Sequence, residues 1–93
     1  MFAITFRVDE GTPLTKEQEE EIASIFEKLL FRWHTGNSYG GLYLADEKNP
    51  LACCYEAINK LSRLPWLKES IEYLGWFRVE DLTNFTKIIK EPL

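Results

Sequence analysis

The sequence predicts an α+β domain in which one four-stranded sheet carries two helices on the same face. Three observations lead to this prediction: an alternating apolar stretch at the N-terminus, two amphipathic helical stretches, and a glycine-rich turn between two strand-like stretches. With 93 residues, the chain has room for one hydrophobic core. We therefore expect 1–93 to form a single domain with a short C-terminal extension.

The first strand and the first helix have the clearest signals. Apolar and polar residues alternate strictly over 2–8, as in a half-buried strand. Its apolar face comprises Phe2, Ile4, Phe6 and Val8. A helix is expected to begin after Thr15, because Thr15-x-x-Gln18 has the pattern of a capping box. The apolar stripe of this helix comprises Ile22, Ile25, Phe26 and Leu29.

A hairpin and a second helix are expected next. The stretches 31–35 and 42–44 have high β propensity and flank the turn-rich stretch 36–41. Asn49 followed by Pro50 is typical of an N-cap and a first helical position, and Pro65 is expected to end this helix. Its apolar stripe comprises Leu51, Cys54, Tyr55, Ile58 and Leu61.

The last core strand, over 71–79, has apolar residues on both faces, which predicts a central strand or a face covered by a partner. The residues expected to face the helices are Ile71, Tyr73, Phe77 and Val79. The opposite face of the sheet is expected to be open. It would carry Ala3, Thr5 and Arg7 of the first strand and Leu74, Trp76 and Arg78 of the last strand. Asp81 is expected to cap a short C-terminal helix. The order β-α-β-β-α-β is that of the ferredoxin-like fold.

The composition and the residue spacings argue against several classes of function. The chain has 11 basic and 15 acidic residues, a net charge of −4, which argues against a nucleic-acid binder that relies on general positive charge. Adjacent Cys53 and Cys54 and the single histidine, His34, lack the spacing of a zinc site. No apolar run is long enough to span a membrane and the N-terminus lacks the features of a signal peptide, so a cytoplasmic location is expected.

Several stretches resemble the bacterial virulence-associated protein D (VapD) family. The closest are Tyr55-Glu56-Ala57-Ile58-Asn59-Lys60-Leu61-Ser62, Trp66-Leu67-Lys68-Glu69-Ser70, and Phe77-Arg78-Val79-Glu80-Asp81 with Phe85-Thr86. Met1-Phe2-Ala3-Ile4-Thr5-Phe6, Phe31-x-Trp33 and Tyr43 extend the resemblance over nearly the whole chain. It implies a ferredoxin-fold homodimer related to the small nuclease-like subunit of CRISPR adaptation. It also implies an endoribonuclease toxin, with RNA, an antitoxin or a second VapD-type subunit as partners.

The chain departs from the family pattern at three positions. The resemblance implies an aspartate after Phe6, a serine in a Gly-Ser-Val-Tyr motif, and an aspartate in the last core strand. This chain has Arg7, Gly41 and Tyr73 there. Paired carboxylates bind a divalent cation or act as a general base, and an arginine does neither at neutral pH. We therefore predict a dimeric scaffold with a degenerate nuclease site, which acts through protein or RNA binding without an assigned cofactor.

An active endoribonuclease is the alternative. Its displaced site would use Asp9, Ser38, His34 and Tyr43, and Mg²⁺ would be its cofactor. As a catalytic group, Asp9 would converge with its mate across the two-fold axis; as a structural group, it would pair with Arg7 or cap the turn. In either case, the face expected to meet RNA or a second subunit comprises Arg7, Arg32, Trp33, Trp76 and Arg78.

Overall fold

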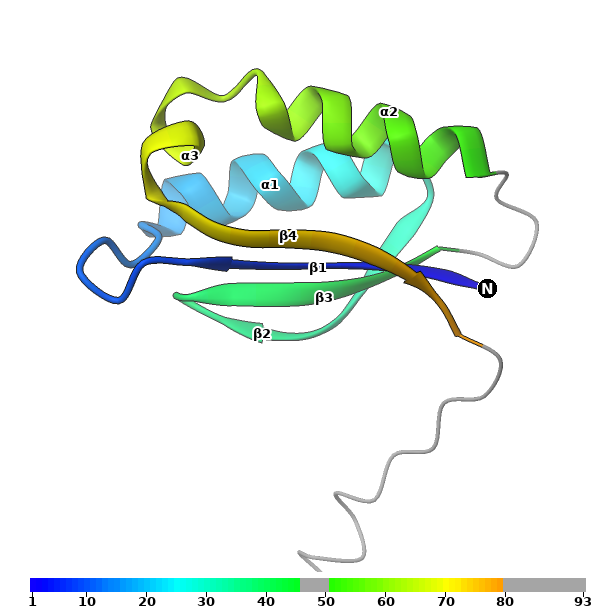
Figure 1. Cartoon of the computed structure of the whole chain (residues 1–93), viewed down its shortest axis with the longest axis horizontal. Helices are drawn as coiled ribbons and strands as arrows, with labels where there is room; N and C mark the ends of the chain where they lie inside the picture. Colours follow the sequence, from blue (N-terminus) through cyan, green and yellow to red (C-terminus); the bar gives the residue numbers. More distant parts are fainter. Residues whose placement is uncertain (46–50, 80–93) are drawn as a thin grey trace, which may run out of the picture.

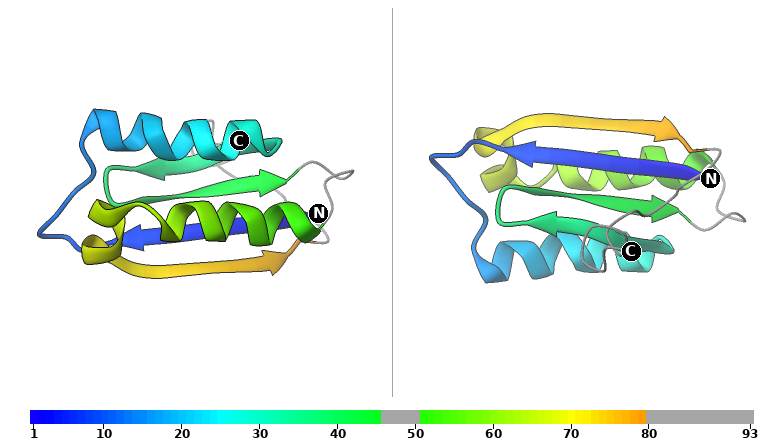
Figure 2. Two further views of the ribbon diagram at one scale, coloured as in Figure 1. Left: turned by 90° about the horizontal axis from the view of Figure 1, so that it is seen from above. Right: turned by 90° about the horizontal axis from the view of Figure 1, so that it is seen from below.

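A computed structural model describes residues 1–45 and 51–79 and has the predicted ferredoxin-like architecture. Its elements are β1 (Phe2–Val8), α1 (Lys16–Lys28), β2 (Phe31–Asn37), β3 (Gly40–Ala45), α2 (Leu51–Ser62), α3 (Pro65–Ser70) and β4 (Ile71–Arg78). The strands form one antiparallel sheet in the order β2-β3-β1-β4. The helices lie on one face of this sheet and leave the other face open (Figures 1 and 2).

The hydrophobic core lies between the sheet and the helices, as the apolar patterns predict. Ile4, Phe6 and Val8 of β1 are buried in it, and Phe2 packs against it. From α1, the predicted stripe contributes the buried residues Ile22, Phe26 and Leu29. From α2, the buried residues are Cys54, Ala57 and Leu61, whereas Tyr55 of the predicted stripe is 58% exposed. Two helices thus cover a sheet whose central strands are β1 and β3.

The last strand is an edge strand, which corrects one of the two interpretations of its sequence. β4 pairs with β1 alone in the four-stranded order, so the central position is wrong. Its apolar residues on both faces therefore leave large side chains exposed, Tyr73 to 57% and Phe77 to 42%. This outcome leaves a covered face as the remaining interpretation.

The predicted faces of β4 are also wrong beyond its first residue, and a β-bulge is the reason. Ile71 is opposite Val8, but Tyr73 is opposite Arg7, so Glu72 is an extra residue and the alternation shifts by one. Leu74 and Trp76 are opposite the core-facing residues of β1, on the helix side. Consequently, Tyr73 and Phe77 lie on the open face.

The helix starts follow local rules. Thr15 forms the predicted capping box, because its side chain accepts from the Gln18 backbone N–H and the Gln18 side chain accepts from the Thr15 N–H. Pro65 ends α2 as predicted but also begins α3, a short helix that was not predicted. The start of α2 at Asn49 and Pro50 and the helix expected after Asp81 lie outside the described residues. No described helix is long and apolar enough to cross a membrane.

Candidate functional site

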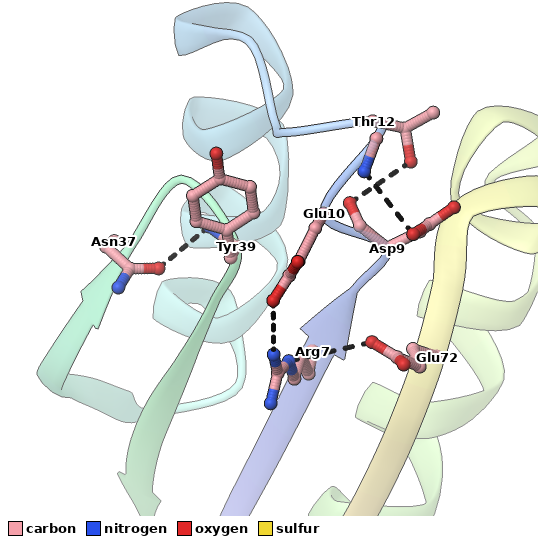
Figure 3. A network of polar contacts seen from close by, with 8 residues as sticks. Arg7, Asp9, Glu10, Thr12, Asn37, Tyr39 and Glu72 are labelled. Carbon is pink, nitrogen blue, oxygen red and sulfur yellow. Dashed lines mark hydrogen bonds and ion pairs between the residues drawn. The ribbon is translucent and has the colours of Figure 1, made fainter.

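Arg7 lies on the open face of the sheet, near the end of the inner strand β1. In the sheet register it is opposite Gly40 of β3 and Tyr73 of β4. Its Nη2 lies 3.2 Å from Oε1 of Glu10, and its Nε lies 3.6 Å from Oε2 of Glu72 (Figure 3). All three side chains are more than half exposed, so water screens these ion pairs. The guanidinium is thus held between two carboxylates of its own chain.

A broad depression of about 1260 Å³ surrounds this arginine. Its lining includes Thr5, Thr35, Asn37, Tyr39, Gly40, Glu72 and Tyr73. Where β3 begins, Gly40 lies so close to β1 that a Cβ would collide with the Phe6 carbonyl oxygen and would lie 3.1 Å from the Cα of Arg7. Because Gly40 has no side chain, the depression is bounded by backbone at this point. At the edge formed by β4, the ring of Tyr73 folds over Gly75. The result is an open surface with one cation, two carboxylates and two tyrosines.

Asp9 is part of the loop after β1 and not a partner of Arg7. Its Oδ1 accepts from the Gly11 backbone N–H (3.3 Å), and its carbonyl accepts from the backbone N–H of Thr12 (3.0 Å). Its own N–H donates to the Ser70 carbonyl (2.8 Å). Within the described chain Asp9 therefore has the turn-capping arrangement, one of the two structural roles considered for it.

The other residues predicted for a displaced nuclease site are spread over the molecule. Ser38 is exposed in the β2–β3 turn, and its carbonyl accepts from the Leu14 N–H (2.7 Å). His34 is half-buried at a bulge of β2. Tyr43 is buried, and its ring stacks on Phe26 with a centroid distance of 3.9 Å. Ser38 therefore lies in the loops at one end of the sheet and Tyr43 inside the helix-side core; the catalytic roles remain predictions.

The five residues predicted for an RNA or dimer face do not share one face. Arg7 and Arg32 lie on the open face by register. Trp33 is opposite the core residue Tyr43, and Arg78 is opposite Phe2, so both lie on the helix side. Their placement corrects the expectation that these five residues form one face.

Trp76 is the clearest of these corrections. Its ring makes edge-to-face contacts with Phe2 and with Tyr55 of α2, at centroid distances of 5.7 and 6.2 Å. It therefore belongs to the packing between β4 and α2 and does not lie on the open face. The exposed aromatic side chains of β4 on the open face are Tyr73 and Phe77.

The carboxylates beside Arg7 are those of Glu10 and Glu72, whereas the sequence indicated Asp9. Glu10 follows Arg7 by three residues, a spacing that could have suggested the pair. Glu72 gave no such signal, because it reaches Arg7 from the bulge of β4. Within residues 1–45 and 51–79, no three Asp, Glu, His or Cys side chains gather in the way a metal ion needs. A cation beside Glu10 and Glu72 would compete with Arg7, so the side chains around Arg7 do not fit Mg²⁺.

Burial shifts the pKa of two side chains on the helix side. The pKa of Tyr43 is raised above its ordinary value by desolvation, and the charge of Glu19 adds to the shift. The pKa of the Cys54 thiol is raised by burial and by the neighbouring Cys53. A raised pKa keeps Cys54 a protonated thiol, which agrees with its predicted place in the apolar stripe of this helix.

The fold and this surface define a small ferredoxin-like protein whose open sheet face carries an arginine between two carboxylates. Comparison with curated proteins then identifies the family. The chain is 34% identical to endoribonuclease VapD of Helicobacter pylori, with 97% of this chain and 99% of that protein covered. It is 35% identical to endoribonuclease VapD of Dichelobacter nodosus, with 97% and 98% covered. Endoribonuclease VapD 1 of Riemerella anatipestifer is 36% identical over 75% of this chain and 73% of its own length.

The chain therefore belongs to the VapD family, as its resemblance implied. No protein-family model matches the sequence. The three positions at which the resemblance implies other residues can now be located in the fold. Arg7 and Tyr73 are cross-strand partners on the open face, whereas Gly41 is opposite Phe6 and lies on the helix side of β3.

Proposed function

We propose that this VapD-family chain is a dimeric scaffold whose nuclease site is degenerate. The observation that carries the proposal is the pair Arg7 and Tyr73, which line the same depression at two positions where the family resemblance implies carboxylates. An arginine held by Glu10 and Glu72 is neither a metal ligand nor a general base at neutral pH. The proposed activity is therefore binding without RNA cleavage.

Protein association is the form of binding that the charges favour. The chain carries a net charge of −4, and the Arg7 guanidinium already has two carboxylate neighbours. Such a surface attracts RNA phosphates weakly. In contrast, Tyr73 and Phe77 expose large aromatic surfaces on the edge strand β4. Aromatic side chains of this kind are enriched in protein interfaces, and an edge strand has free backbone groups for pairing. We therefore place the proposed dimer contact at β4.

A ribonuclease assay tests the degenerate site. The purified chain is incubated with RNA that has both single-stranded and structured parts, with and without Mg²⁺ or Mn²⁺. We expect no cleavage above that of a mock purification. The double variant Arg7→Asp/Tyr73→Asp, which introduces both carboxylates, is expected to gain metal-dependent cleavage. Cleavage by the wild-type chain that disappears in Asp9→Ala would overturn the proposal.

A second candidate function is an active ribonuclease. It is favoured because relatives that match the chain over nearly their full length are named endoribonuclease VapD. Its site would be displaced toward Asp9 and Ser38, with His34 as the acid or base. Single Asp9→Ala and His34→Ala variants would then each lose most cleavage, and Glu17→Ala would leave it unchanged. Light scattering tests dimer formation independently of RNA cleavage. A monomeric mass at micromolar concentration would refute the proposed dimeric scaffold even if no cleavage were detected.

A further inference from the structure

A second depression, of about 320 Å³, opens on the opposite side of the sheet from Arg7. It lies between α1 and the end of the β2–β3 hairpin. Gly36 and Gly41 are paired there across the two strands, so no side chain from this pair fills the space. Gly36 has no room for a Cβ, which would lie 2.7 Å from the Gly40 carbonyl oxygen. A Cβ at Gly41 would make ordinary contacts of 3.4 Å or more. The backbone therefore does not require a glycine at this position, and a side chain here would extend into the depression.

A buried tyrosine with unused hydrogen-bonding capacity lines this depression. Tyr43 is only 7% exposed, and its hydroxyl has no hydrogen-bond partner in the part of the chain that the structure describes. Buried polar groups without a partner are uncommon and costly. Burial raises the pKa of Tyr43, and the negative charge of the nearby Glu19 adds to the shift. The hydroxyl is therefore available for a ligand that enters beside Glu19.

The remaining walls have the chemistry of a cation site. Glu19 and Glu20 of α1 line the depression, and neither makes an ion pair with another described residue. Trp33 lines the opposite side and is 61% exposed. Its Nε1 would lie 3.2 Å from a Cβ at Gly36, so the indole leans over the hairpin end. Two negative charges and an exposed indole on the walls of one depression attract a flat cation and repel a phosphate.

We propose that this depression, the Trp33 pocket (Glu19, Glu20, Trp33, Gly41 and Tyr43), binds the guanidinium of an arginine side chain on a partner protein. A guanidinium stacks on an indole and presents paired N–H donors to a carboxylate and a tyrosine oxygen. The volume of the Trp33 pocket is at the lower end of the range for small ligands, which suits one side chain. This site is independent of the proposed function, because it opens on the other side of the sheet.

Nuclear magnetic resonance tests the Trp33 pocket directly. The chain has three tryptophans, Trp33, Trp66 and Trp76, so its ¹⁵N spectrum has three indole N–H signals. The Trp33 signal is assigned with Trp33→Phe. The probe is Nα-acetyl-arginine amide, and its uncharged analogue Nα-acetyl-citrulline amide is the ligand control. We expect the arginine probe to shift the Trp33 signal saturably and to leave the other two in place.

Matched variants identify the source of any binding. Glu19→Gln removes a carboxylate of the Trp33 pocket and should weaken binding roughly tenfold. Glu17→Gln makes the same charge change on the exposed first turn of α1 and should leave affinity within about twofold. Gly41→Ser should also weaken binding, because the new side chain occupies the pocket. The backbone amide spectrum checks that each variant is folded. An unresponsive Trp33 signal, an equal response to citrulline, or equal weakening by Glu17→Gln would overturn the proposal.

Discussion

Arg7 of β1 and Tyr73 of β4 are directly opposite each other on the open face of the sheet. Both occupy positions where the family resemblance implies a carboxylate, and both line one depression. Had these positions been two aspartates, like charges would adjoin and would favour a bound cation or a raised pKa. With arginine and tyrosine, one positive charge instead lies between the carboxylates of Glu10 and Glu72. Relative to the implied aspartates, the charge at these two positions changes from negative to positive.

The ion pairs of Arg7 should contribute little to stability. Arg7→Gln removes both, but the side chains are exposed, at 58% for Arg7 and 57% for Glu72. We expect the free energy of unfolding to fall by less than about 1 kcal/mol. Urea denaturation followed by circular dichroism measures this change, with Phe26→Ala as a strongly destabilised control. A loss above about 2 kcal/mol for Arg7→Gln would show that the pairs are structural.

The elements that the sequence predicted correctly are those with local causes. The capping box of Thr15 and the alternation of β1 depend on residues a few positions apart. The faces of β4 depend on a bulge opposite Arg7 and Val8, which nothing in its own sequence marks. The same bulge explains the candidate site. Arg7 was correctly placed on the open face, but Glu72 was not predicted as its partner, because register between distant strands is a tertiary property.

Neighbouring aromatic residues of β4 should have different effects on stability. Trp76 and Phe77 are similarly exposed, at 39% and 42%, but lie on opposite faces. Trp76→Ala removes contacts with Phe2 and Tyr55 and should cost about 2 kcal/mol of unfolding free energy. Phe77→Ala should cost less than about 1 kcal/mol in the monomer. Urea unfolding at low protein concentration compares them. Equal losses would contradict the assigned faces.

The raised pKa of Tyr43 predicts a loss of stability in alkaline solution. The unfolded chain ionises this tyrosine near its ordinary value of 10.0, whereas the folded protein keeps it neutral to higher pH. Between these two pKa values the unfolded state binds fewer protons, so the free energy of unfolding falls as the pH rises. Unfolding is measured at about pH 8 and about pH 11, with Tyr43→Phe beside the wild-type chain.

Tyr43→Phe should have a smaller alkaline loss than the wild-type chain, because it removes the group responsible. Tyr55→Phe is the control, since Tyr55 is 58% exposed. If Tyr43→Phe and Tyr55→Phe lost equal stability between the two pH values, the buried tyrosine would not be the cause. At neutral pH, Tyr43→Phe should be close to neutral in stability, because its hydroxyl has no described hydrogen-bond partner.

The two adjacent glycines of β3 should respond differently to the same substitution. A Cβ at Gly40 would collide with the Phe6 backbone, which cannot move without breaking the pairing of β1 and β3. Gly40→Ala should therefore cost more than about 2 kcal/mol of unfolding free energy. At Gly41 the nearest atoms are 3.4 Å away or more, so Gly41→Ala should cost less than about 1 kcal/mol. Thermal and urea unfolding of both variants measure the difference, and a destabilised Gly41→Ala with an intact Gly40→Ala would contradict the close approach of β3 to β1.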